Sequence, residues 1–262
     1  MKTKEEIKEE NLVEDNSDID MEPNYYAFDD YVMNFDLKEE HLKSKYTHSY
    51  RVTKECKNIS ESLNFSPEDV YISEVIGLLH DIGRFYQYTE FETFSDSKYF
   101  NHADYGVKIL FEDNEIKKYN LKETYYPLVK TAIENHNKYK IGKCNEDEML
   151  FSMVIRDADK LDILYQYAVI NLKAIDTVKG EEICEEYEKD FFNNIQIHIK
   201  NNDNASEKVV RTLALIFDLN FDYSFEKIIK EKYIEKIYKQ VNNKEILKPY
   251  FDEIKKYLED YK

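Results

Sequence analysis

Apolar residues recur at helical spacing along almost the whole chain, and this periodicity limits the fold more than any other feature of the sequence. From about Tyr25 to the end, large apolar side chains return every three or four residues, as they do on the buried face of an α-helix. The 262 residues include only 5 Gly and 4 Pro, too few for the turns of an all-β chain. The sequence therefore predicts an all-α protein.

Composition along the chain divides it into three predicted segments. Residues 1–22 are acidic and carry few large apolar side chains, which predicts a disordered lead. Residues 23–176 form a first helical block, and residues 177–262 form a C-terminal helical extension packed on that block. Near the end, an apolar stripe at helical spacing predicts packing on the main body or on a second copy in a homodimer. This stripe consists of Leu247, Tyr250, Phe251, Ile254, Tyr257 and Leu258.

The charge balance excludes several classes of partner. Asp and Glu number 54 against 37 Lys and Arg, a formal net charge of -17, so we expect neither duplex nucleic acid nor an anionic membrane as a surface partner. The chain has no apolar run of about 18 residues and no apolar leader at its start. Its three cysteines, Cys56, Cys144 and Cys184, are widely spaced and predict reduced thiols. These features predict a cytoplasmic protein, and the abundance of Lys, Asn, Ile and Tyr suggests an AT-rich bacterial genome.

Four of the six histidines lie on apolar helical faces and are predicted to point inward: His48, His80, His102 and His136. His80 is followed by Asp81 in EVIGLLHDIGRF, a segment that is apolar on all sides, so this carboxylate is buried as well. Any one of these histidines alone is better explained as a hydrogen-bonded core residue. Together they need a common source of compensation, because a buried carboxylate without a partner is costly. A divalent cation supplies it, since neutral imidazoles and ionised carboxylates are its ligands.

Three aspartates enter a second apolar helix, MLFSMVIRDADKLDILYQYAV. Asp157, Asp159 and Asp162 each have apolar neighbours three or four residues away, so periodicity places carboxylates in the core without choosing which one binds metal. The two other histidines are weaker candidates. His41 lies at a charged, exposed helix start and His198 in a polar–apolar alternation, and we expect both to be ordinary structural residues.

The order His48, then His80-Asp81, then an aspartate of RDADKLD resembles the H…HD…D signature of the HD superfamily of metal-dependent phosphohydrolases. The likeness spans roughly residues 40–175 and is carried by THSYRV, GLLHDIGRF and IRDADKLD. The superfamily fold is an all-α helical bundle, in agreement with the periodicity; here it would carry additional C-terminal helices. In related sequences the last ligand is the aspartate of an Ala-Asp-x-hydrophobic pattern, which maps to Asp159, with Asp157 as the runner-up.

Two further histidines resemble those of a binuclear subgroup. His102 in NHADYGVKIL and His136 in AIENHN stand where YqeK-type dinucleoside tetraphosphate hydrolases and HD-GYP phosphodiesterases place their third and fourth histidines. The resemblance implies six ligands for two divalent transition-metal ions, bridged by Asp81, with Fe or Mn preferred and Co, Ni or Zn also accommodated. The chain lacks the Gly-Tyr-Pro motif, so we do not expect cyclic di-GMP hydrolysis. It is also longer than YqeK-type enzymes, so their substrate does not transfer to it.

The resemblance implies a hydrolase that cleaves a phosphoester or phosphoanhydride of a small nucleotide-like or phosphometabolite substrate through a metal-activated water. Lys160 resembles a phosphate-contacting lysine and could instead assist the leaving group, while Arg84 is one turn beyond the HD pair and within reach of a phosphate. The alternative for each is a surface cation in a salt bridge. Two other functions remain open on the same scaffold: a mixed-valent di-iron oxygenase, and a non-catalytic metal- or nucleotide-binding module.

Overall fold

The computed structural model describes residues 19–97, 99–170, 176–198 and 203–259. Within these ranges every extended regular element is a helix, and the only strand-like pairing is an isolated bridge between Ser97 and Phe100. The all-α prediction is confirmed. Residues 1–18, most of the predicted disordered lead, lie outside the described residues. No helix in the described ranges has both the length and the apolar character needed to cross a membrane.

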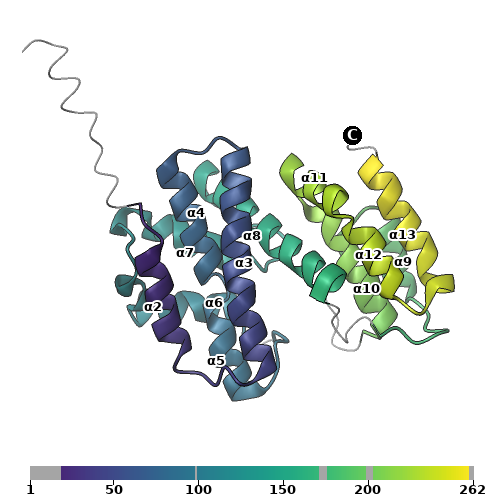
Figure 1. Ribbon diagram of the computed structural model, residues 1–262, viewed down its shortest axis with the longest axis horizontal. Coiled ribbons are helices and arrows are strands. Elements are labelled where there is room, and N and C mark those ends of the chain that lie inside the picture. Colours follow the sequence, from purple (N-terminus) through teal and green to yellow (C-terminus); the bar gives the residue numbers. More distant parts are fainter. Residues whose placement is uncertain (1–18, 98, 171–175, 199–202, 260–262) are drawn as a thin grey trace, which may run out of the picture.

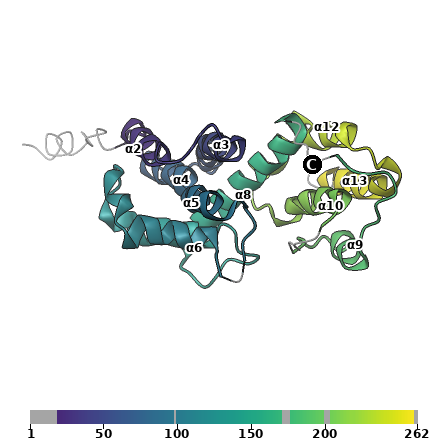
Figure 2. The same cartoon turned by 90° about the horizontal axis from the view of Figure 1, so that it is seen from below.

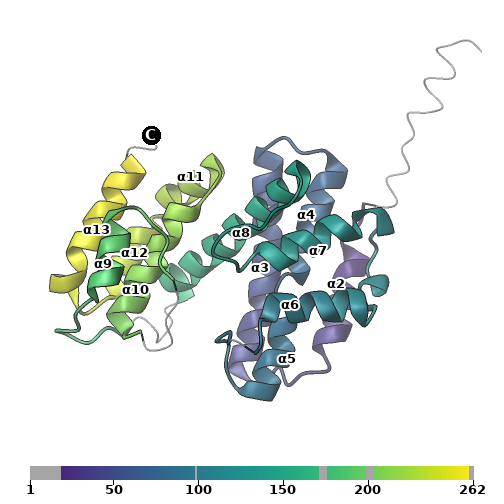
Figure 3. The same ribbon diagram turned by 180° about the vertical axis from the view of Figure 1, so that it is seen from behind.

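The first block is built around three helices that lie against one another, α3, α4 and α8, with the others packed on their sides (Figures 1 and 3). In chain order its helices are α2 (Glu22–Val32), α3 (Glu40–Ser62), α4 (Pro67–Leu79), α5 (Ile82–Phe91), α6 (His102–Val107), the π-helical turn η2 (Lys108–Glu112), the 3₁₀ turns η3 (Glu115–Lys118) and η4 (Glu123–Tyr125), α7 (Tyr126–Asn135) and α8 (Glu146–Tyr165).

The second block follows α8 and the π-helical turn η5 (Gln166–Ile170), and Figure 2 shows it at the far end of the molecule from α2. Its helices are α9 (Glu185–Phe192), α10 (Ala205–Ala214), the 3₁₀ turn η7 (Leu215–Asp218), α11 (Asp222–Glu231), α12 (Tyr233–Gln240) and α13 (Lys244–Glu259). The helix α8 contacts elements of both blocks. The boundary predicted at residue 176 comes after this shared helix and stays a prediction.

The two blocks are joined by polar contacts made from α8 and α3. The buried Asp157 carboxylate of α8 accepts hydrogen bonds from Asn220 and Phe221 backbone N–H groups, from the Asn220 side chain and from the Ser224 hydroxyl. On α3, Glu55 accepts a hydrogen bond of 2.7 Å from Lys227 Nζ of α11. Both contacts hold the start of α11 and its first turns against the first block.

The apolar stripe predicted near the end of the chain lies on α13. Leu247, Tyr250, Phe251, Ile254 and Leu258 are all buried, and α13 packs on α9, α10 and α12 of the same chain. The stripe therefore packs within its own C-terminal block, which is neither the first block nor a second copy. A homodimer stays an untested prediction.

Local sequence explains where the helices that carry the site begin and end. Ser66 caps α4 by accepting a hydrogen bond from the Asp69 backbone N–H, and Pro67 occupies the first turn. Asn145 and Glu148 form a reciprocal capping box at the start of α8. Between α4 and α5 the helix breaks at Asp81, whose φ and ψ are -105° and 16°. Its side chain makes no capping bond, so the carboxylate is available to other partners.

Gly83 allows α5 and α6 to approach closely. A Cβ atom at this position would overlap the backbone oxygen of His102 and lie 2.9 Å from Gly106 N. Both of these are backbone atoms, so no side-chain rotation can make room. The missing side chain at Gly83 therefore sets the distance between Asp81, two residues earlier, and His102, at the start of α6.

We expect Gly83→Ala to push α6 away from α5 and to lower the free energy of unfolding by roughly 1–3 kcal/mol, as overpacking does. The displacement carries His102 away from Asp81, so metal content should fall together with stability. Thermal denaturation and elemental analysis of the purified variant measure the two effects. Gly142→Ala is the matched control, because a Cβ there would meet only the Asn135 side chain, at 3.4 Å. Equal effects of the two substitutions would contradict this account.

Candidate metal centre

Six side chains that the sequence predicts as metal ligands come together in the first block. They arise from α3, the α4–α5 junction, the start of α6, the end of α7 and the middle of α8, five stretches that are far apart in the sequence. Five of the six are buried, and the sixth has a side chain that is 21% exposed. The residues are His48, His80, Asp81, His102, His136 and, on the exposed side, Asp159.

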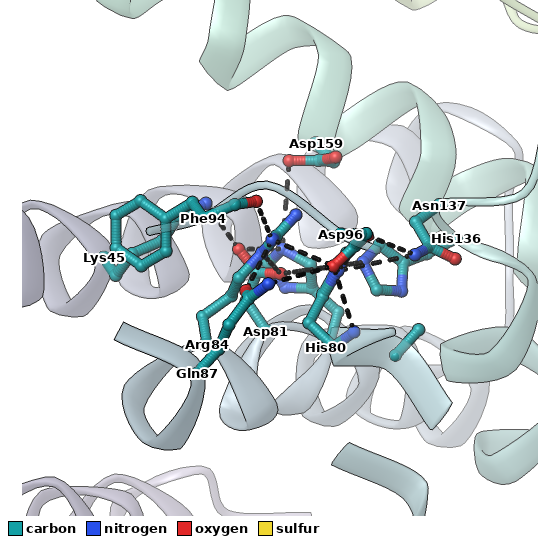
Figure 4. A network of polar contacts seen from close by, with 12 residues as sticks. Lys45, His80, Asp81, Arg84, Gln87, Phe94, Asp96, His136, Asn137 and Asp159 are labelled. Carbon is teal, nitrogen blue, oxygen red and sulfur yellow. Dashed lines mark hydrogen bonds and ion pairs between the residues drawn. The ribbon is translucent and has the colours of Figure 1, made fainter. Parts of the chain in front are cut away.

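Asp81 lies at the centre of the cluster, between two pairs of imidazoles, and Figure 4 shows it beside one ring of each pair, those of His80 and His136. Its Oδ2 atom is 3.4 Å from His48 Nε2 and 3.6 Å from His80 Nε2. Its Oδ1 atom is 3.3 Å from His102 Nε2 and 3.6 Å from His136 Nε2. Each oxygen of the carboxylate thus faces a different pair of histidines, which creates two adjacent sets of donor atoms that share one residue.

Asp159 completes the first set. Its Oδ1 atom is 3.2 Å from His48 Nε2 and 3.8 Å from His80 Nε2. The donor atoms of these three residues lie within 4.8 Å of one another, and so do those of His80, Asp81 and His136. In Figure 4, the Asp159 side chain points from α8 toward the cluster, from the side opposite Asp81. Because Asp159 is the most exposed of the six, its side of the cluster is the open one.

The three aspartates of α8 have three different surroundings, which the apolar periodicity alone leaves unresolved. Asp157 is two residues before Asp159, about 200° around the helix, and its carboxylate faces α11 in the C-terminal block. Asp162 lies one turn after Asp159 and contacts the outer nitrogen of His48. Only Asp159 lies among the inner nitrogens, so the structure places the preferred candidate, and not the runner-up Asp157, in the cluster.

All four histidines are oriented by acceptors on their outer nitrogens. His48 Nδ1 is 2.6 Å from Asp162 Oδ2, and His102 Nδ1 is 2.7 Å from Asp96 Oδ2. His80 Nδ1 and His136 Nδ1 face the backbone oxygens of residues 77 and 133, at 2.8 and 2.7 Å. An acceptor at Nδ1 holds the ring proton there and turns the Nε2 lone pair inward, the usual arrangement of metal-binding histidines.

The inward nitrogens approach one another closely. His48 Nε2 is 3.3 Å from His80 Nε2, and His102 Nε2 is 2.9 Å from His136 Nε2. In the neutral form that a metal ligand requires, with the ring protons on Nδ1, these rings would present lone pairs to each other at such distances, and two lone pairs repel. A cation between them turns the repulsion into coordination, and imidazole and carboxylate donors suit divalent transition metals. The residues present therefore fit a divalent metal ion.

The charge states of several of these groups already match those of metal ligands. Burial raises the pKa of Asp81, but the charge of Lys45 and hydrogen bonds from the neighbouring imidazoles outweigh it, and the pKa lies well below its usual range. Burial lowers the pKa of His80 to about 3, which leaves this ring neutral. His48 differs: burial and Lys45 lower its pKa, but hydrogen bonds to Asp159, Asp162 and Asp81 raise it to about 10.

Three residues near the cluster were not among the candidates predicted from the sequence. Lys45 Nζ donates a hydrogen bond of 2.6 Å to Asp81 Oδ2 (Figure 4). Its position one turn before His48 on α3 is a signal that could have identified it. Asp96, the partner of His102, lies in a loop without periodicity, so no pattern marked it. Arg51 donates to the Asp162 carboxylate through Nε, at 2.5 Å, and holds that carboxylate against His48.

The cluster opens into a cavity of about 200 Å³ that reaches the C-terminal block. On one side lie Asp81, Asp159 and the two histidines of the second set; Gln196 and Leu215 of the C-terminal block lie on the other. Five basic residues also line it: Lys45, Arg84, Lys138, Arg156 and Lys160. The predicted substrate contacts Arg84 and Lys160 are thus both at this cavity, where an anion would enter.

Neither of these two cations is a surface residue without partners. Arg84 donates to Gln87 Oε1 at 2.7 Å and to the Phe94 backbone oxygen, and its Nε is 3.6 Å from Asp81 Oδ1. Lys160 is buried, and its Nζ lies 2.8 Å from Asp218 Oδ2 of the C-terminal block. Both side chains are therefore fixed at the cavity by neighbouring acceptors.

The two remaining histidines lie outside the cluster. The His41 ring packs against the Tyr88 ring, with centroids 5.0 Å apart. The exposed His198 stacks on Tyr139, with centroids 3.7 Å apart. Neither is among the groups of residues that could hold a metal ion in the described part of the chain.

Comparison with protein families identifies the part of the chain that carries the cluster. Residues 46–164 match the HD domain family. The matched segment covers somewhat less than half of the chain. It includes all six clustered side chains, and the HD domain is an all-α fold whose members bind divalent metals. No curated protein and no solved structure matches the chain.

We expect metal binding to release one proton from His48. Because the pKa of this ring is about 10 without metal, the ring is protonated at neutral pH, whereas a ligand must be neutral. Apparent metal affinity should therefore rise roughly tenfold per pH unit between pH 7 and 9, and level off as the pH approaches that pKa. Competition with a chelator of known pH dependence measures the slope. An affinity that is constant above pH 7, as for a histidine with an ordinary pKa, would contradict this expectation.

We expect Asp162→Ala to weaken metal binding about 10- to 100-fold, because it removes the acceptor that orients His48. Asp162→Asn keeps an oxygen acceptor and should restore part of the affinity. Arg51→Met separates the two partners of Asp162, since it leaves the His48 contact in place. Titration of the metal-free protein with Mn²⁺ measures all three variants, and an equal loss in Asp162→Asn and Asp162→Ala would exclude the orienting role.

Proposed function

We propose that the chain is a binuclear, metal-dependent phosphohydrolase that acts on a small phosphorylated substrate. The HD domain supports the general class, because its family consists generally of metal-dependent phosphohydrolases. The two donor sets around Asp81 support two metal ions. The observation that carries the proposal is the cavity itself, in which four of the six candidate metal ligands and five basic residues line one space.

The first metal would be held by His48, His80, Asp81 and Asp159, and the second by His102, His136 and the other oxygen of Asp81. We propose Fe or Mn, with Co, Ni and Zn as alternatives, since this ligand set accommodates all of them. When bound, the two cations supply Lewis-acid activation of a water molecule and stabilise charge on the attacking and leaving oxygens.

The residues of the chain itself would bind and orient the phosphoryl group. Lys45 contacts Asp81 Oδ2, which faces the first donor set, and Arg84 contacts Oδ1, which faces the second. Both charges would therefore lie close to a phosphoryl oxygen that meets the two donor sets. Lys160 would contact a phosphate or the leaving group from α8. Hydrolysis joins the oxygen of water to phosphorus and breaks the bond to the leaving oxygen, which takes up a proton.

The basic lining favours this reaction over the alternatives on the same scaffold. Five basic residues around one cavity suit an anionic substrate better than the neutral organic substrate of an oxygenase. The open side at Asp159 favours catalysis over a purely structural metal, because structural sites are closed by their protein ligands. The net charge of -17 disfavours long nucleic acids and leaves small nucleotides or phosphometabolites as substrates.

Elemental analysis and phosphate release from the full chain test the proposal. We expect two equivalents of metal per chain, and phosphate release from at least one member of a panel of phosphomonoesters, cyclic nucleotides and dinucleoside polyphosphates. His80→Ala and Asp81→Ala should abolish both, whereas His198→Ala, a histidine outside the cluster, should change neither. Full metal occupancy without hydrolysis across the panel would favour the binding module, and oxygen-dependent turnover without phosphate release would favour the oxygenase.

A further inference from the structure

Two buried cations on α8 share one carboxylate from the C-terminal block. Arg156 and Lys160 are one turn apart, and their residues are only 3% and 5% exposed. Asp218, the last residue of η7, places its Oδ2 atom 2.5 Å from an Arg156 nitrogen and 2.8 Å from Lys160 Nζ. The Asp218 side chain is 29% exposed, so the carboxylate is the accessible member of the cluster.

Arg156 is held rigidly by a second group of acceptors. Its Nη1 atom donates to the backbone oxygens of Asn135, His136 and Lys138, at the end of α7 and just beyond it. The guanidinium is therefore fixed in place whether or not Asp218 is bound. These backbone oxygens carry no net charge, so among the described residues Asp218 is the one carboxylate in ion-pair contact with the two buried cations, and the charge of Asp157 acts on Lys160 without such a contact.

These two cations line the same cavity as four of the candidate metal ligands, Asp81, His102, His136 and Asp159. Its volume of about 200 Å³ lies below the roughly 300–1,000 Å³ of typical drug-sized pockets. The described residues that line it include only two aliphatic side chains, Ile163 and Leu215, and no Phe or Tyr; its only aromatic rings are the imidazoles of the candidate ligands His102 and His136. The space thus suits a compact and strongly polar molecule.

We propose that Arg156 and Lys160 form a second anion subsite, at which Asp218 stands in for a ligand, and that the substrate is a compact molecule with two anionic groups. This inference rests on the proposed function and deepens it. One anionic group is the phosphoryl group hydrolysed at the metal centre. The other displaces the Asp218 carboxylate from the two cations, an exchange of one anion for another that involves no covalent step.

The competing explanation is that Asp218 only stabilises the packing of the two blocks against each other. Asp157 already provides such a contact between the blocks, with hydrogen bonds from Asn220, Phe221 and Ser224 of the same segment. The two explanations differ in what they predict for anions. If Asp218 has only a structural role, removing its charge lowers stability without affecting anion binding. If it occupies an anion subsite, removing its charge makes molecules with two anionic groups bind more tightly.

Equilibrium binding of two matched, non-hydrolysable probes distinguishes these explanations. The probes are 1,3-propanediphosphonate and propylphosphonate, which differ only in the second anionic group, and the readout is the ratio of their affinities for the full, metal-loaded chain. We expect the diphosphonate to bind roughly 10- to 100-fold more tightly, as two charge-assisted contacts allow. Asp218→Asn should raise this ratio because the internal competitor is removed, and Lys160→Gln should lower it toward one.

Matched controls remove the same charges elsewhere. Glu55→Gln and Lys227→Gln break an ion pair between α3 and α11 that does not line the cavity, so both should leave the ratio unchanged. Thermal denaturation checks folding, and the wild-type ratio together with the partly exposed Asp218 variant decides the question if Lys160→Gln fails to fold. A wild-type ratio near one would overturn the subsite. So would a ratio that Asp218→Asn and Lys160→Gln both leave unchanged, because the second phosphonate would then bind the metals.

The binding ratio separates this proposal from the proposed hydrolysis. If the ratio responds to Lys160→Gln and Asp218→Asn but no phosphoester is hydrolysed, the subsite stands and the hydrolase does not. If phosphomonoesters are hydrolysed while the ratio stays near one, the hydrolase stands and the subsite is overturned. If neither phosphonate binds to the metal-loaded chain, both proposals are overturned.

Discussion

The burial of one ionised carboxylate, that of Asp81, governs the arrangement of the first block. Asp81 is only 3% exposed, yet its pKa lies well below the ordinary value, so the folded chain must surround a negative charge with compensating groups. The helix break between α4 and α5 frees this side chain from capping its own helix, and Gly83 lets α6 come close enough to bring His102 to it. Four imidazoles and Lys45 provide the surroundings.

Much of this arrangement was predictable from the sequence, because the buried face of a helix carries apolar residues at every third or fourth position. The all-α fold follows from apolar spacing and scarce Gly and Pro, and the structure confirms it. The inward positions of His48, His80, His102 and His136 follow from the apolar stripes on which they lie, and all four rings meet at Asp81. Their role as metal ligands stays a prediction, to which the geometry now adds the orientation of each ring.

What periodicity could not supply is direction within a helix that is buried on several faces. On α8, burial is satisfied on every face, so Asp157, Asp159 and Asp162 look alike in the sequence although they point to different neighbours. Contacts between distant segments leave even less trace. Asp218 lies 62 residues after Arg156, in a short 3₁₀ turn, and nothing in the local pattern connects the two.

The position of α8 between the two blocks has a thermodynamic consequence. One face of this helix carries Asp159 toward the candidate metal centre, and another carries Asp157 into the start of α11. A single rigid element therefore takes part in two equilibria, cation binding and docking of the C-terminal block. Linkage makes such coupling reciprocal: to the extent that a bound cation steadies α8 for docking, docking strengthens the hold on the cation by the same factor. Substitutions at the contact between α8 and α11, outside the candidate metal centre, would then change the affinity for metal.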